Sequence, residues 1–111
     1  MSTPDDAETS RAFSDAVNLT AKQLSAWLDT DESRSVGQHK DGDAESTGHQ
    51  EGRRIVEILG RRKGDLTEDD YAHMRKVVGY VHRHLAQRPD GDVTDTPWRY
   101  SLMNWGHDPL K

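Results

Sequence analysis

The chain has 111 residues, a formal net charge of −5 and an apolar fraction of only 32%, which leaves room for one modest hydrophobic core. It contains no cysteine, and this excludes disulfides, thiolate zinc sites and cysteine nucleophiles. It has no apolar run long enough to span a membrane and no signal-peptide pattern in its polar N-terminus. We therefore expect a cytoplasmic protein without a membrane partner.

Residues 1–9 are predicted to be disordered, and a short helix is expected over residues 10–18. A second helix is expected to begin at Ala21, because Thr20 and Gln23 have the spacing of a capping box. This helix should end near Asp29. The segment 30–47 has almost nothing to bury apart from Val36, so it is predicted to be a mobile polar loop.

A third helix is expected from His49 to Lys63, with Gly64 as its C-cap. A fourth is expected over residues 66–88, because Thr67 can cap it and Pro89 must end it. Its buried stripe is predicted from apolar side chains at three- and four-residue spacing: Tyr71, Met74, Val78, Val81 and Leu85.

The C-terminal part predicts a short docked helix. Thr96 precedes a proline at the first helical position, and Gly106 follows the last turn. Trp98 and Trp105 are expected to share its inner face. Every element is helical, so the predicted class is all-α, a single domain over residues 10–110 built as a compact bundle of about four helices with this C-terminal helix docked on it.

Helices three and four form a predicted helix-turn-helix-like hairpin over residues 49–88, joined by Gly64-Asp65-Leu66. A recognition helix presents its N-terminal residues to DNA bases, but this one begins with three carboxylates, Glu68, Asp69 and Asp70. We therefore expect any DNA contact to use the later part of helix four or the arginines of helix three. An ordinary αα-hairpin is the alternative.

Positive charge is concentrated in the middle of the chain. Residues 52–88 hold nine Lys or Arg and five Asp or Glu, whereas residues 1–51 hold four and eleven. A basic segment between acidic flanks indicates a candidate surface for the phosphate backbone of DNA or RNA. The candidate contacts are Arg53, Arg54, Arg61, Lys76, Tyr80, Arg83 and Arg88, of which Tyr80 could stack on a base.

Two structural alternatives apply to these residues. Lys76, Tyr80, Arg83 and Gln87 form one column along helix four, and such a column is often simply a solvated face. The arginines of helix three are three or four residues from Glu57, so intrahelical ion pairs could explain them. Gly79, in the middle of helix four, is expected to permit close approach of another helix.

A second candidate site is an anion site at the start of helix three. Gly48 and His49 would offer free backbone N–H groups there, and Arg53 lies one turn further on. Ordinary N-capping is the alternative. The histidines lack the spacing of a helical metal site and the catalytic motifs of common enzymes are absent, so we expect no metal, no cofactor and no catalytic residue.

Four segments, LTAKQLSAWL, ESTGHQEGRRIVEIL, LTEDDYAHMRKVVGYVHRHLAQRP and WRYSLMNWGHDP, resemble an uncharacterised family of small, mainly bacterial proteins, the domain of unknown function 3140. Members of that family are often labelled DNA-binding, and no activity is established for it. The resemblance adds modest support for nucleic-acid binding and supplies no catalytic residue. Together with the basic segment it leads us to expect a non-enzymatic binding module that contacts DNA or RNA. The alternative is a protein-interaction or regulatory domain, with the acidic loop or the Trp98 and Trp105 tail engaging a partner.

Overall fold

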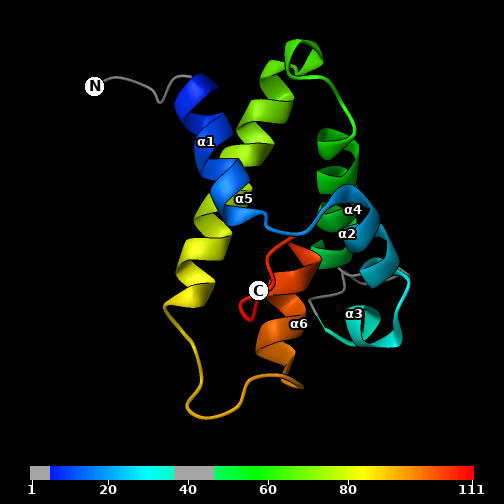
Figure 1. Cartoon of the computed structure of the whole chain (residues 1–111), viewed down its shortest axis with the longest axis vertical. Helices are drawn as coiled ribbons and strands as arrows, with labels where there is room; N and C mark the ends of the chain where they lie inside the picture. The colour runs from blue at the N-terminus through cyan, green and yellow to red at the C-terminus, as the bar shows by residue number, and fades with distance from the viewer. Residues whose placement is uncertain (1–5, 37–46) are drawn as a thin grey trace.

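The computed structural model describes residues 6–36 and 47–111, and in these residues the secondary structure is entirely helical (Figure 1). This confirms the all-α class. The helices are α1 (Asp6–Ala16), α2 (Ala21–Leu28), α3 (Asp31–Ser35), α4 (Thr47–Leu59), α5 (Glu68–Leu85) and α6 (Pro97–Asn104), with a short 3₁₀ turn, η1 (Lys63–Asp65), before α5.

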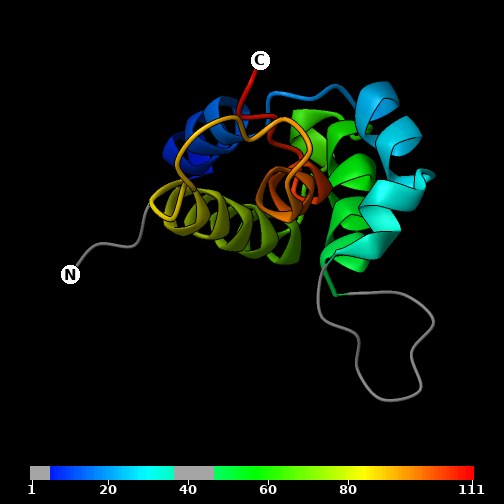
Figure 2. The ribbon, with the colours of Figure 1, turned by 90° about the horizontal axis from the view of Figure 1, so that it is seen from below.

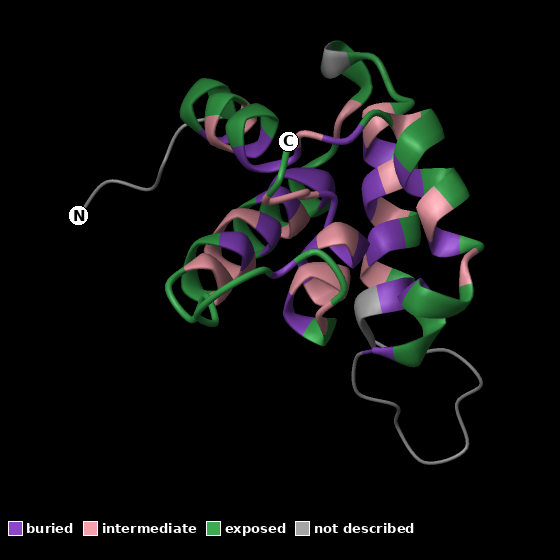
Figure 3. Cartoon of the chain, turned by 60° about the horizontal axis from the view of Figure 1, so that its bottom comes forward, coloured by how far each residue is buried: buried purple, intermediate pink, exposed green. Residues whose placement is uncertain are grey.

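The helices form two packed pairs with α6 between them. α1 packs along α5, and α2 packs along α4. α6 contacts both pairs, so it closes the core from below in the view of Figure 1, and Figure 2 shows it between α5 and α4. The buried positions face this shared interior from every helix (Figure 3). The C-terminal helix is therefore docked on the bundle, as predicted.

The first helix begins four residues earlier than the sequence indicated. The prediction of disorder is wrong for residues 6–9, which form the first turn of α1. Thr9 is buried one turn before Phe13, so the helix gains packing on α5 that a purely apolar pattern does not reveal. Residues 1–5 lie outside the described residues.

The predicted polar loop also begins with a helix. Thr30 caps α3 by accepting a hydrogen bond from the Ser33 N–H, and Ser33 is completely buried. A mobile loop is therefore wrong for residues 31–36. Val36 is buried, as expected. The rest of that loop, residues 37–46, lies outside the described residues.

The connection between α4 and α5 is longer than predicted. α4 ends at Leu59, and Gly64 lies in η1 instead of capping the preceding helix. α4 and α5 make few backbone contacts with each other, because each packs mainly on a different partner. Side-chain ion pairs, described below, hold these two helices together.

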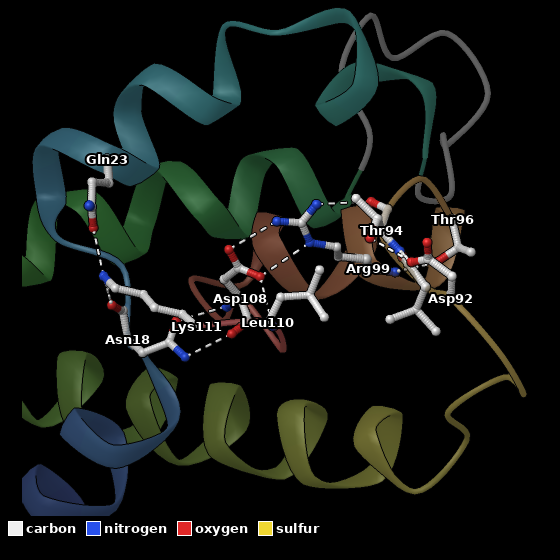
Figure 4. A network of polar contacts seen from close by, with 10 residues as sticks. Asn18, Gln23, Asp92, Thr94, Thr96, Arg99, Asp108, Leu110 and Lys111 are labelled. Carbon is white, nitrogen blue, oxygen red and sulfur yellow. Dashed lines mark hydrogen bonds and ion pairs between the residues drawn. The ribbon is translucent and has the colours of Figure 1, made fainter.

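The C-terminal tail is fixed by a polar network (Figure 4). Arg99 donates two hydrogen bonds to the Asp108 carboxylate, and Asp108 exchanges two more through its backbone with the Asn18 side chain. Gly106 has φ +83°, where an L side chain would be strained, and an added Cβ would meet Val17 at 2.8 Å. The tail is thus locked against the end of α1.

Trp98 and Trp105 are both buried in this arrangement, with exposed fractions of 8% and 5%. They pack on the core as expected, which corrects the suggestion that they offer a surface to a protein partner. The apolar surface of both rings is buried within the chain itself, where it stabilises the fold.

Candidate nucleic-acid interface

The N-terminus of α5 is built by a capping box. Thr67 accepts a hydrogen bond from the Asp70 N–H, and the Asp70 carboxylate accepts one from the Thr67 N–H. Acidic residues suit this end of the helix, because its free N–H groups carry partial positive charge. α5 therefore starts where the sequence predicts.

Asp70 also joins α4 to α5. Its carboxylate is completely buried and accepts hydrogen bonds from Arg54, at 3.1 Å, and from Arg61, at 2.6 Å. The Thr67 N–H bond lowers the pKa of Asp70 most, and with the two guanidinium groups it outweighs the effect of burial, so that the pKa is about 2. Arg54 and Arg61, both predicted to contact nucleic acid, thus have a structural role.

A second polar clamp links the same two helices one turn further along. Glu51 in α4 contacts His73 at 3.1 Å and Lys76 at 2.8 Å, both in α5. Burial lowers the pKa of His73, although the Glu51 charge acts in the opposite direction. Lys76 is still 57% exposed, so it can contact a ligand, but part of its charge is compensated by Glu51.

Tyr80 belongs to a stack of rings between α5 and α6. Its ring lies 4.0 Å from Trp105 and 5.3 Å from His84, and His84 lies 5.9 Å from Trp98, all with interplanar angles of 12–13°. Arg88 covers Trp98 at 5.6 Å. Burial raises the pKa of Tyr80 and lowers that of His84. Tyr80 is therefore half-buried, and its ring is less exposed than expected because it stacks on Trp105 and His84.

The exposed face of α5 combines Arg83, which the sequence predicts as a contact, with two residues that the sequence analysis did not select, Arg75 and His82. Arg75, His82 and Arg83 are exposed, and within the described part of the chain neither arginine forms an ion pair. Arg75 was missed because Val77, and not Val78, is the completely buried valine. This turns the outer face toward Arg75. The absence of any carboxylate from residue 71 to residue 88 was the available signal.

Gly79 was expected to permit close approach of another helix. This expectation is wrong, because Gly79 lies on the outer face of α5. A Cβ at Gly79 would meet only the end of the Arg83 side chain, at 3.1 Å. The close approach occurs at Gly52 in α4, where a Cβ would meet the Asn104 carbonyl oxygen at 2.5 Å and Leu28 at 2.8 Å. Gly52 is thus the glycine that the packing of α4 on α2 and α6 requires.

At the predicted anion site, the His49 side chain is buried and bound to the protein itself. Gly48 is in the first turn of α4, and His49 is buried, with its Nε2 atom 2.6 Å from the Leu28 carbonyl oxygen. A carbonyl can only accept, so Nε2–H donates. This bond fixes α4 to the end of α2. Arg53 is exposed on the same helix, and a hollow of about 270 Å³ beside it is lined by both Arg53 and His49.

Two other classes of site have no support in the residues that the structure describes. Among them, no three His, Asp or Glu side chains gather closely enough to hold a metal ion. None of the described helices combines the length and apolar character needed to cross a membrane.

Comparison with known proteins gives a family and no function. The sequence profile described as "Protein of unknown function (DUF3140)" matches residues 12–103. No curated protein and no solved structure matches the chain.

Proposed function

We propose that this chain, which belongs to the DUF3140 family of proteins of unknown function, is a non-enzymatic cytoplasmic module that binds the phosphate backbone of DNA or RNA through the outer face of α5. One observation carries the proposal. From residue 71 to residue 88 the chain has four Lys or Arg side chains and no carboxylate, although its net charge is −5. Such segregation is typical of a surface that attracts a polyanion.

The exposed cations are distributed along the helix. Arg75 and Arg83 are exposed on α5, and Lys76 lies beside them. Eight residues separate the two arginines, which is about 12 Å along a helix axis. Duplex DNA carries about one charge per 1.7 Å, so several phosphates lie within reach of this face.

The acidic first turn sets the direction of the contact. Glu68 and Asp69 are exposed at the N-terminus of α5, where they repel phosphate. The backbone should therefore meet the middle and the C-terminal half of the helix. Binding of this kind depends on charge and has little sequence preference.

The test is fluorescence anisotropy of labelled duplex DNA and duplex RNA of mixed sequence, titrated at several salt concentrations. With three to four phosphate contacts, the slope of log affinity against log salt should be about −3 to −4. The variant Arg75→Ala/Arg83→Ala should bind more weakly and reduce the magnitude of this slope by about 2. Absence of binding at low salt would refute the proposal.

A matched control is Lys22→Ala/Arg34→Ala, which removes the same charge from exposed positions of α2 and α3. These helices lie on the opposite side of the molecule from α5 (Figure 2). The control should keep the wild-type slope. Equal weakening by both variants would show that net charge, and not the α5 face, governs binding.

A protein partner is the second candidate for the same face. Ala72, Gly79 and Ala86 follow one another at seven-residue spacing and are exposed or half-buried. These small residues would let a partner helix approach closely. A partner whose affinity hardly changes with salt, together with no nucleic-acid binding, would favour this function.

A further inference from the structure

A cavity of about 420 Å³ lies on a part of the molecule that the α5 face does not use. It is bounded by α1, by the end of α4 with the connection that follows it, and by α5. α1 packs on α5 but not along α4, and the side chains between them leave this hollow. Its volume is in the range of small-molecule sites.

One part of the cavity lining is apolar. Phe13, Ile58 and Met74 are buried core residues that line it. Leu59 and Leu66 also line it and are only half-buried. Apolar side chains that are partly open to solvent favour a ligand with an apolar body, because the ligand would remove their surface from water.

Hydrogen-bond donors gather at the same cavity. The Ser10 Oγ atom is buried and has no hydrogen-bond partner among the described residues, which is unfavourable for a hydroxyl. Arg11 is exposed without an ion pair to any described residue. Arg61 gives one N–H to Asp70, and its guanidinium has further donors.

We propose that this cavity binds a small monocarboxylate with an apolar body, such as a medium-chain fatty acid. The apolar chain lies against Leu59 and Leu66, and the carboxylate accepts hydrogen bonds from Ser10 and Arg11. A rotation about χ1 of Ser10 turns its hydroxyl toward the carboxylate. Asp15, also at the cavity, disfavours ligands with a second negative charge.

The site is independent of the proposed nucleic-acid function. Ser10 and Arg11 precede the segment 12–103 that the family profile matches. Relatives that lack the hydroxyl and the guanidinium at these two positions should bind the ligand less well.

The experiment titrates the full chain with octanoate and follows backbone amide chemical shifts by NMR. Octan-1-ol and octylammonium serve as matched ligands with the same apolar body. Octanoate should give saturable shifts at residues that line the cavity, octan-1-ol weaker ones and octylammonium the weakest. Failure of octanoate to saturate at millimolar concentration, or equal binding of octylammonium, would overturn the proposal.

Three variants locate the site. Ser10→Ala and Arg11→Ala should each weaken octanoate binding about ten-fold, the lower end of the effect of losing one hydrogen bond to a charged group. Ser14→Trp places a large ring at an exposed position that lines the cavity, and it should abolish binding while circular dichroism shows an unchanged helix content. Unchanged affinity in both Ser10→Ala and Arg11→Ala would overturn the assignment even if Ser14→Trp did not fold.

Discussion

Tyr80 lies almost parallel to Trp105, with ring centroids 4.0 Å apart and an interplanar angle of 13°. On the same helix as Tyr80, Lys76 places its Nζ atom 6.0 Å from the Trp105 ring. α6 is thus held against α5 by stacking and by a cation–π contact. The same residues that suggest a nucleic-acid surface in the sequence support the docked C-terminal helix in the structure.

Tyr80→Ala should therefore lower the free energy of unfolding by about 2 kcal/mol, since a half-buried stacked ring is lost. Tyr80→Phe keeps the stack and should change stability little. Urea denaturation followed by Trp fluorescence measures both. If Tyr80→Phe binds nucleic acid like the wild type, the Tyr80 hydroxyl has no role in binding. A folded Tyr80→Ala variant with wild-type stability would contradict the structural role.

The two helical glycines should respond to alanine in opposite directions. Gly52→Ala forces a Cβ against the Asn104 carbonyl oxygen, and such overpacking costs about 1–3 kcal/mol. Gly79→Ala displaces only the flexible end of Arg83, and it should gain up to about 1 kcal/mol through helix propensity. The comparison needs only the urea midpoints of the two variants and the wild type. Equal effects would show that α4 is not closely packed at Gly52.

Local signals along the chain predicted much of this fold. The capping boxes at Thr20 and Thr67 and the proline after Thr96 fix helix starts through contacts within a few residues. The sequence therefore locates α2, α5 and α6 correctly. α3 was missed because its inner side chain, Ser33, is polar, and its burial depends on a hydrogen bond to Asn104, 71 residues away.

The candidate site was less predictable, because charge pairing is a long-range property. Arg54 and Arg61 look like free cations in the sequence, and only the fold brings both to the buried Asp70. Arg75, in contrast, was not selected from the sequence. Its exposure follows from the burial of Val77, which defines the inner face of α5. Charge composition pointed to α5, and tertiary packing decides which of its charged side chains are exposed and unpaired.

Acid should destabilise the protein over a pH range that is set by the titration of Asp70. Its pKa is about 2 in the folded chain against 3.8 ordinarily, so the folded state favours the ionised form. The contribution of Asp70 to the free energy of unfolding is complete above about pH 4 and is lost as the pH falls toward 2. Asp70→Asn should lower the melting temperature at pH 7 and flatten the loss of stability between pH 4 and pH 2. Asp69→Asn, at an exposed neighbouring position, should keep the wild-type profile.

Two half-buried histidines, His73 and His84, should make stability depend on pH in a second range. The pKa values of His73 and His84 lie below the ordinary 6.5, in both cases mainly because burial disfavours the charged ring. Folding thus favours the neutral form of both rings. The resulting contribution to the free energy of unfolding is complete above pH 6.5, and it is lost as the pH falls through the lower pKa values of the folded state. Melting temperatures from pH 7.5 to 5 should fall, and less steeply in His84→Gln. His82→Gln, an exposed control, should follow the wild type.

Asn104 should be among the most sensitive positions in the chain, because it joins three helices. Its Oδ1 atom accepts hydrogen bonds from Trp27 in α2 and from Ser33 in α3, and its Nδ2 donates to the Ser33 carbonyl. Asn104→Ala leaves several of these groups unpaired and should cost about 3 kcal/mol in urea denaturation.

Asn104→Asp makes a sharper test of the same hydrogen bonds. At pH 7 it keeps the acceptor but removes the donor and buries a charge, so the variant should be strongly destabilised. Burial raises the pKa of such a carboxyl, and the protonated form can donate to the Ser33 carbonyl again. The stability difference from the wild type should therefore shrink as the pH falls from 7 to 5. A difference that stays constant over this range would mean that the donor at position 104 does not bind Ser33.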